Sequence, residues 1–64
     1  MTPQEYTTRR AKLISEFNFL KSMRLFRSAA ARIRKIADLD YEYDNIPREK
    51  TKQLFNYKEI YNKG

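Results

Sequence analysis

Apolar residues recur at intervals of three and four along nearly the whole chain, which is the period of a helix with one buried face. A helix is predicted to begin at Pro3, because Thr2, Pro3 and Glu5 fit the N-cap, the first-turn proline and the N3 carboxylate of a capping box. In the segment 21–37, apolar and basic residues occupy two separate arcs of the helical wheel. The apolar arc holds Met23, Leu25, Phe26, Ala29, Ala30, Ile33, Ile36 and Ala37, and the basic arc holds Lys21, Arg24, Arg27, Arg32, Arg34 and Lys35.

The apolar face changes sides near residues 18–22. On the same wheel, the apolar residues that precede residue 21 fall in the arc that basic residues occupy in the segment 21–37. These apolar residues are Tyr6, Leu13, Ile14, Phe17 and Leu20. Either the chain bends into two helices, with Asn18 or Ser22 capping the second, or one long helix offers opposite faces to different partners. No Gly or Pro marks a break. We favour the bend, because a lone domain needs its apolar stripes to meet in one place.

The remainder of the chain predicts a loop and a last helix. Residues 38–44 alternate acidic and apolar positions, but no second strand candidate lies nearby, so this stretch is interpreted as a helix end and loop. Pro47 opens a helix from 47 to about 62, with Phe55 off its apolar stripe of Leu54, Tyr57, Ile60 and Tyr61. We predict a single all-α domain over residues 1–64, a small three-helix bundle. The alternative is a helical hairpin completed by homodimerisation, since so short a chain buries only about 60% of its unfolded surface.

Basic residues are concentrated in the middle of the chain, whose formal net charge is +6. Residues 17–37 contribute +6 and contain no acid, whereas residues 38–45 contribute −4 and contain no base. Like charges three or four residues apart destabilise a helix by about 0.2 to 0.5 kcal/mol per pair. An anion is therefore expected to offset this repulsion. It is either an external partner, which we place first, or the chain's own Asp38, Asp40, Glu42 and Asp44.

We predict that the chain is a small basic regulatory protein, and that its external partner is nucleic acid, either DNA or RNA. Arg presents a planar fork of donors that suits phosphate oxygens, and several cations lie on one helical face. Alanines between the arginines are expected to keep the helix slim enough to enter a major groove. The predicted contact residues are Lys21, Arg24, Arg27, Arg32, Arg34 and Lys35, with a second contact at Arg9, Arg10 and Lys12. Nothing in the pattern predicts recognition of particular bases.

An acidic surface of a larger protein is the alternative partner, which would make this chain a small helical inhibitor or adaptor. Such docking needs the same cations together with exposed aromatic side chains at the contact. The candidates are Tyr41, Tyr43, Tyr57 and Tyr61, with Phe19 and Phe55, which both lie off their apolar stripes.

Composition argues against catalysis, a bound metal or cofactor, and a membrane partner. His and Cys are absent, and no spacing pairs another nucleophile with a carboxylate base, so no enzyme is predicted. The acids from Asp38 to Glu49 follow the spacing of a calcium loop, but Tyr43 replaces the turn glycine and Pro47 interrupts it. No apolar run approaches the roughly 20 residues of a membrane span, and the start MTPQEY lacks a secretory signal. We expect a cytoplasmic protein.

Three short segments resemble a known family. FRSAA at 26–30 and YDNIP at 43–47 are similar, at matching separation, to segments of the Hha and YmoA nucleoid-modulating proteins, and TPQEY at 2–6 resembles their start. A segment that this family uses for a further helix is missing, and Ala31 stands where its acidic residue follows the alanine pair. None of the predictions above depends on this resemblance.

Overall fold

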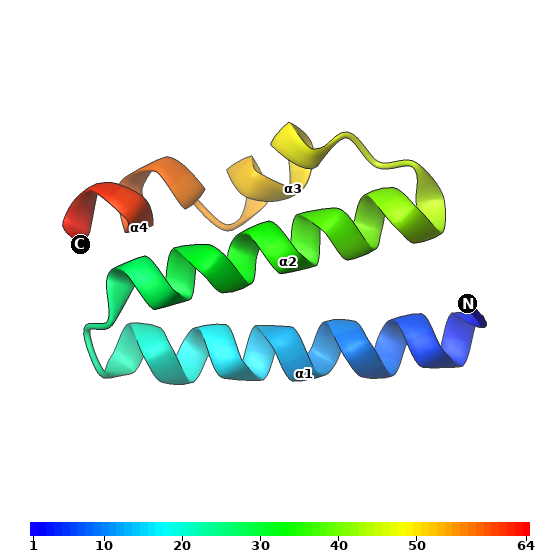
Figure 1. Cartoon of the computed structure of the whole chain (residues 1–64), viewed down its shortest axis with the longest axis horizontal. Coiled ribbons are helices and arrows are strands. Elements are labelled where there is room, and N and C mark those ends of the chain that lie inside the picture. The colour runs from blue at the N-terminus through cyan, green and yellow to red at the C-terminus, as the bar shows by residue number, and fades with distance from the viewer.

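The computed structural model describes all 64 residues, and its regular elements are all helices. They are α1 (Pro3–Ser22), α2 (Phe26–Asp44), α3 (Arg48–Leu54) and α4 (Tyr57–Lys63). In Figure 1, α1 and α2 form an antiparallel hairpin, and α3 and α4 follow one another along the other side of α2. The all-α prediction is confirmed. The chain has four helices where three were predicted, because the last predicted helix is broken in two.

The start of α1 has the predicted N-cap but not the full capping box, because the Glu5 carboxylate accepts a hydrogen bond from the Thr2 hydroxyl, at 3.4 Å, and not from the Thr2 backbone N–H. Thr2 is the N-cap, and its Oγ1 accepts a hydrogen bond from the Glu5 backbone N–H at 3.1 Å. Pro3 occupies the first turn, where its missing N–H costs nothing because that donor has no partner within the helix. The predicted start at Pro3 is therefore confirmed, and local chemistry alone accounts for it.

The chain bends between α1 and α2, as favoured, but later and with a different cap. After Ser22 the helix closes with a Schellman motif, in which Arg24 N–H donates to the Lys21 carbonyl and Leu25 N–H to the Leu20 carbonyl. Arg24 lies in the left-handed region, with φ 61°. The cap residues Asn18 and Ser22 were predicted wrongly, since Leu25 is the N-cap of α2 and makes no side-chain hydrogen bond. The turn also exposes Met23 and Leu25, which the wheel had placed on the buried arc.

We expect Arg24→Gly to raise the free energy of unfolding. A left-handed conformation costs an L-residue about 1 to 2 kcal/mol, and glycine avoids this cost but loses more entropy on folding, which leaves a gain of about 0.5 to 1 kcal/mol. Urea denaturation followed by circular dichroism measures the change. The matched control is Arg34→Gly, an exposed position inside α2, which should lower stability by about 1 kcal/mol. A loss in both variants would contradict the interpretation of the turn.

The last predicted helix breaks at Phe55 and Asn56. Asn56 adopts a left-handed conformation, with φ 56°, and this residue separates α3 from α4. The break turns Phe55 into the core, where its ring meets that of Phe17 edge to face, with centroids 5.6 Å apart. Leu54, which a continuous helix would have buried, is instead 70% exposed. Two predictions are thus corrected: Phe55 is a packing residue, and Leu54 lies outside the apolar stripe.

The core lies where the apolar side of α2 meets both of its neighbours. The buried cluster is Phe17, Ala29, Ala30, Ile33 and Ile60, with Leu20, Phe26, Phe55 and Tyr57 packed against it. The apolar stripes of α1 and α2 therefore meet within one chain. The Cα trace extends 34 × 20 × 13 Å, so α2 is the middle of a flat arrangement and its opposite side stays open to solvent. None of the four helices has the length and apolar character needed to cross a membrane.

Candidate nucleic-acid interface

The exposed side of α2 carries most of the predicted cations of this helix. Ala29, Ala30, Ile33, Ile36 and Ala37 are fully or almost fully buried, as the apolar arc predicts. Arg27, Arg34 and Lys35 lie on the other side and are exposed, while Arg32 is half-buried. Within α2, burial therefore follows the two arcs that the periodicity predicts.

The other predicted cations of segment 21–37 belong to the end of the hairpin. Lys21 is in the last turn of α1, with its Nζ 5.3 Å from the centre of the Phe17 ring. Arg24 is exposed in the turn. Arg27 begins α2, and its guanidinium lies 4.9 Å from the centre of the Tyr61 ring. Because the chain turns between them, Lys21 and Arg24 do not share a helical face with Arg34 and Lys35, which corrects the predicted continuous basic arc.

Arg32 and Arg10 differ from the other predicted contacts because each donates a hydrogen bond to a carboxylate of another helix, whereas Arg9 makes only an exposed ion pair at 3.9 Å with Glu5 of its own helix. Arg32 Nε donates to Glu16 Oε1 at 3.0 Å across the seam between α1 and α2. Arg10 Nε donates to Asp40 Oδ1 at 3.0 Å, and the Arg10 side chain is only 26% exposed. Arg10 is thus a structural residue, and the second contact predicted at residues 9–12 is reduced to Arg9 and Lys12, both exposed on α1.

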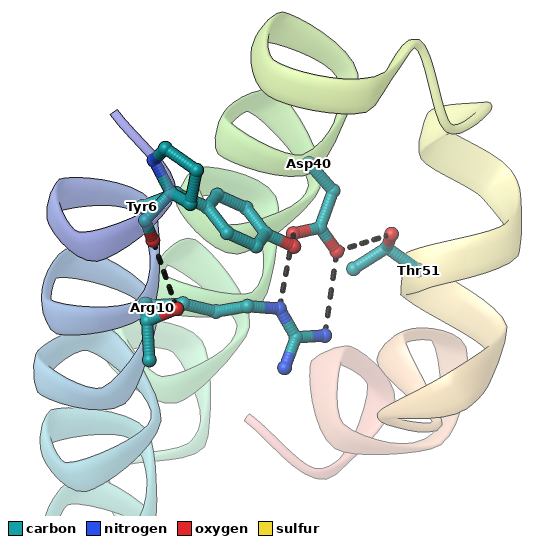
Figure 2. A network of polar contacts seen from close by, with 6 residues as sticks. Tyr6, Arg10, Asp40 and Thr51 are labelled. Carbon is teal, nitrogen blue, oxygen red and sulfur yellow. Dashed lines mark hydrogen bonds and ion pairs between the residues drawn. The ribbon is translucent and has the colours of Figure 1, made fainter. Parts of the chain in front are cut away.

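Arg10 belongs to a buried polar network that joins three helices (Figure 2). The Asp40 carboxylate, 2% exposed, accepts hydrogen bonds from the Tyr6 hydroxyl at 2.6 Å and from the Thr51 hydroxyl at 2.9 Å. The Arg10 guanidinium donates to both carboxylate oxygens, the second at 3.3 Å. The Tyr6 ring stacks on that of Tyr43, with centroids 4.2 Å apart. The network therefore ties α1 to α2 and α3.

The network shifts the titration of its members. Burial disfavours the charged form of Asp40, but hydrogen bonds from Arg10, Tyr6 and Thr51 outweigh it, so the pKa of Asp40 falls below its ordinary value of 3.8. Burial, followed by the hydrogen bond to Asp40, raises the pKa of the Tyr6 hydroxyl above 10.0. Asp40 is thus held as an anion although it is buried.

Stability should therefore depend on pH in the acid range. The pKa of Asp40 is lower in the folded chain than in the unfolded chain, so its stabilising contribution is complete above the unfolded value near 3.8. It is lost as the pH falls below this value towards the folded pKa. Urea denaturation between about pH 6 and about pH 2 measures this fall, and Asp40→Asn should show a smaller one. Equal acid dependence in the two chains would contradict the role of Asp40.

The acidic segment does not neutralise the basic segment. Asp40 is bonded to Arg10, and Asp38 accepts a hydrogen bond from Arg48 Nε at 2.7 Å, so both partners lie outside residues 21–35. Glu42 and Asp44 have no ion-pair partner within 4.0 Å. No group of three or more acidic side chains gathers closely enough to hold a metal ion.

The alanines of α2 do not have the predicted role. Alanines 29, 30 and 37 were expected to slim the helix, but they are buried against neighbouring helices. With α1 on one side and α3 and α4 on the other, α2 is the middle of a body 20 Å wide, which is broader than a major groove of about 12 Å. The slim, isolated helix that was expected is therefore absent, because neighbouring helices flank α2 on both sides.

The sequence held signals for two features that the prediction missed. Arg10 lies on the apolar stripe of α1, four residues after Tyr6 and three before Leu13, and Asp40 continues the buried stripe of α2 beyond Ile36. A charged residue on each of two facing stripes indicates a buried pair.

Comparisons with family models, with characterised proteins and with solved structures find no match.

Proposed function

We propose that the protein binds the phosphate backbone of nucleic acid, DNA or RNA, as a small regulatory protein. We call the binding residues the cationic surface; it has two parts, Lys21 and Arg24 at the hairpin turn, and Arg27, Arg34 and Lys35 on the exposed side of α2. One observation carries the proposal: of the six basic side chains between residues 21 and 35, only Arg32 is bonded to a carboxylate. The remaining five keep their charge free to bind an external anion.

The chemistry of these side chains suits phosphates. Arg24, Arg27 and Arg34 present planar forks of donors, which match pairs of phosphate oxygens. Each phosphate that a cation neutralises releases condensed counterions, so affinity should fall steeply as the salt concentration rises. Because the cations lie on an outer face, they contact the backbone without entering a groove, and binding should be nearly independent of base sequence.

Fluorescence anisotropy with labelled DNA and RNA, at about 50 mM and about 200 mM salt, tests the proposal. Arg34→Gln/Lys35→Gln should weaken binding about tenfold or more and reduce the slope of log affinity against log salt by about 2. The matched control is Lys50→Gln/Lys58→Gln, which removes two exposed helical cations from α3 and α4.

The control variant should bind nearly as well as the unaltered chain. Equal weakening in both double variants would mean that net charge, and not the cationic surface, drives binding. No binding to any nucleic acid at the lower salt concentration would refute the proposal.

An acidic surface of a partner protein is the second candidate, and the hairpin turn favours it. Phe19, Met23 and Leu25 are 62%, 59% and 50% exposed beside Lys21 and Arg24. Aromatic residues, Met and Arg are enriched where proteins contact one another. If an acidic protein surface is the partner, the chain is an inhibitor or adaptor, and the titrations with labelled DNA and RNA should show no binding.

A further inference from the structure

A shallow groove follows the seam between α1 and α2, on a surface to which α3 and α4 contribute no residue. It consists of two hollows of about 480 and 450 Å³, which adjoin at the ion pair of Glu16 and Arg32, residues that line both. We call it the seam groove. The lining residues that matter for its chemistry are Lys12, Glu16 and Phe19 of α1 and Arg32, Lys35 and Glu42 of α2.

The middle of the seam groove keeps an excess of positive charge. Lys12 from α1 and Lys35 from α2 are both exposed and have no carboxylate partner. The carboxylates of Glu16 and Asp38 are already bonded to Arg32 and to Arg48, and Glu42, the one unpaired carboxylate of the groove, offsets only one of the two lysines. The two lysines therefore supply a net charge that an anionic chain along the seam can neutralise.

Phe19 lies at the end of the seam groove nearest to the turn. Its side chain is 62% exposed although it is a large apolar group, and the same hollow contains Leu20 and Arg32. Phe19 and Lys12 are seven residues apart on one helix, which is about 10 Å along the axis. This distance corresponds to about three nucleotides at the 3.4 Å spacing of a helical strand.

We propose that the seam groove binds single-stranded nucleic acid, with a base stacked on Phe19 and phosphates about three nucleotides further along the strand at Lys12 and Lys35. The inference rests on the proposed function and names its substrate class. A charged groove that follows the backbone, combined with an aromatic platform for bases, is the arrangement by which single strands are bound without sequence preference. In a duplex the faces of the bases are covered by their neighbours, so the Phe19 ring has no base to stack on.

A second copy of this chain fits the groove poorly. Docking two seam grooves against one another places the unneutralised Lys12 and Lys35 of both copies together, and desolvated like charges across an interface oppose association. An anionic strand instead complements both the charge and the exposed ring.

Three probes of about 12 nucleotides separate base stacking from phosphate binding: oligothymidine, an abasic strand with the same number of phosphates, and a duplex. Fluorescence anisotropy at about 50 mM salt should show tighter binding to oligothymidine than to the abasic strand. Phe19→Ala should weaken the binding of oligothymidine between about fivefold and about 150-fold, and should leave the abasic strand unaffected. Phe19→Tyr, which keeps an aromatic face, should retain most of the affinity.

Leu54→Ala on α3 is the matched control, because it removes another large exposed side chain, 70% exposed, away from the seam. It should leave the affinity for all three probes unchanged. Equal affinity for oligothymidine and the abasic strand, or no effect of Phe19→Ala, overturns the inference while salt-dependent phosphate binding preserves the proposed function. Absence of binding to all three probes overturns both.

Discussion

Asp40→Ala should lower the free energy of unfolding by about 3 to 5 kcal/mol, the range for breaking a buried ion pair by removing one partner. The substitution leaves the half-buried Arg10 guanidinium without its anion and removes the acceptor for the hydroxyls of Tyr6 and Thr51. A domain of this size has a total stability of roughly 3 to 10 kcal/mol, so a large part of it depends on one carboxylate. Urea denaturation followed by circular dichroism measures the loss.

The matched control is Glu42→Ala, which removes an exposed carboxylate from the same helix, two residues further on. It should change stability by no more than about 0.5 kcal/mol. Replacing both charges in Arg10→Met/Asp40→Leu should recover part of the loss, because an apolar pair leaves no unpaired buried charge. If Asp40→Ala is no more damaging than Glu42→Ala, the network does not stabilise the fold.

Phe17→Ala should cost about 3 to 5 kcal/mol, the range for truncating a buried aromatic residue. Phe17 is 4% exposed and is the buried residue of α1 in the core cluster. Its ring packs edge to face against Phe55, so the substitution opens a cavity between the hairpin and the segment that covers it. Thermal unfolding should show a fall in Tm of more than about 10 °C, given about 4 to 8 °C per kcal/mol in a small domain.

Phe19→Ala provides the control for Phe17→Ala, since it makes the same chemical change two residues further along α1. Phe19 is 62% exposed, so its loss should alter stability by no more than about 0.5 kcal/mol. The pair thus separates burial from residue type. Comparable losses in the two variants would mean that α1 packs through a different face.

Local rules predicted those parts of the fold that depend on neighbours in the chain. The start of α1 follows from a hydrogen bond between residues three apart, Thr2 and Glu5. The buried stripe of α2 follows from helical periodicity, which assigns Ile33 and Ile36 to the core and Arg34 and Lys35 to solvent. Both features involve only residues within a few positions of one another, so the order of amino acids is enough to predict them.

The same rules failed where packing overrides the local pattern. A continuous last helix would bury Leu54 and expose Phe55, but the break at Asn56 reverses these roles, because the larger ring fills the space beside Phe17. The turn at Arg24 carries no Gly or Pro signal. Backbone hydrogen bonds of the turn hold Arg24 in its left-handed conformation. The spacing of apolar residues gives no information about these hydrogen bonds, so it could not predict the turn.

At the candidate interface, the order of amino acids is enough to give the number of cations, their concentration in residues 21–35 and the side of α2 on which they lie. Which of these cations are free of a carboxylate partner depends on how the helices pack. Arg10 is bonded to a residue 30 positions away and Arg32 to one 16 positions away, while Arg34 and Lys35 meet no carboxylate. Ion pairing depends on distances of a few ångströms between side chains, and for residues so far apart in sequence the packing of the helices sets those distances.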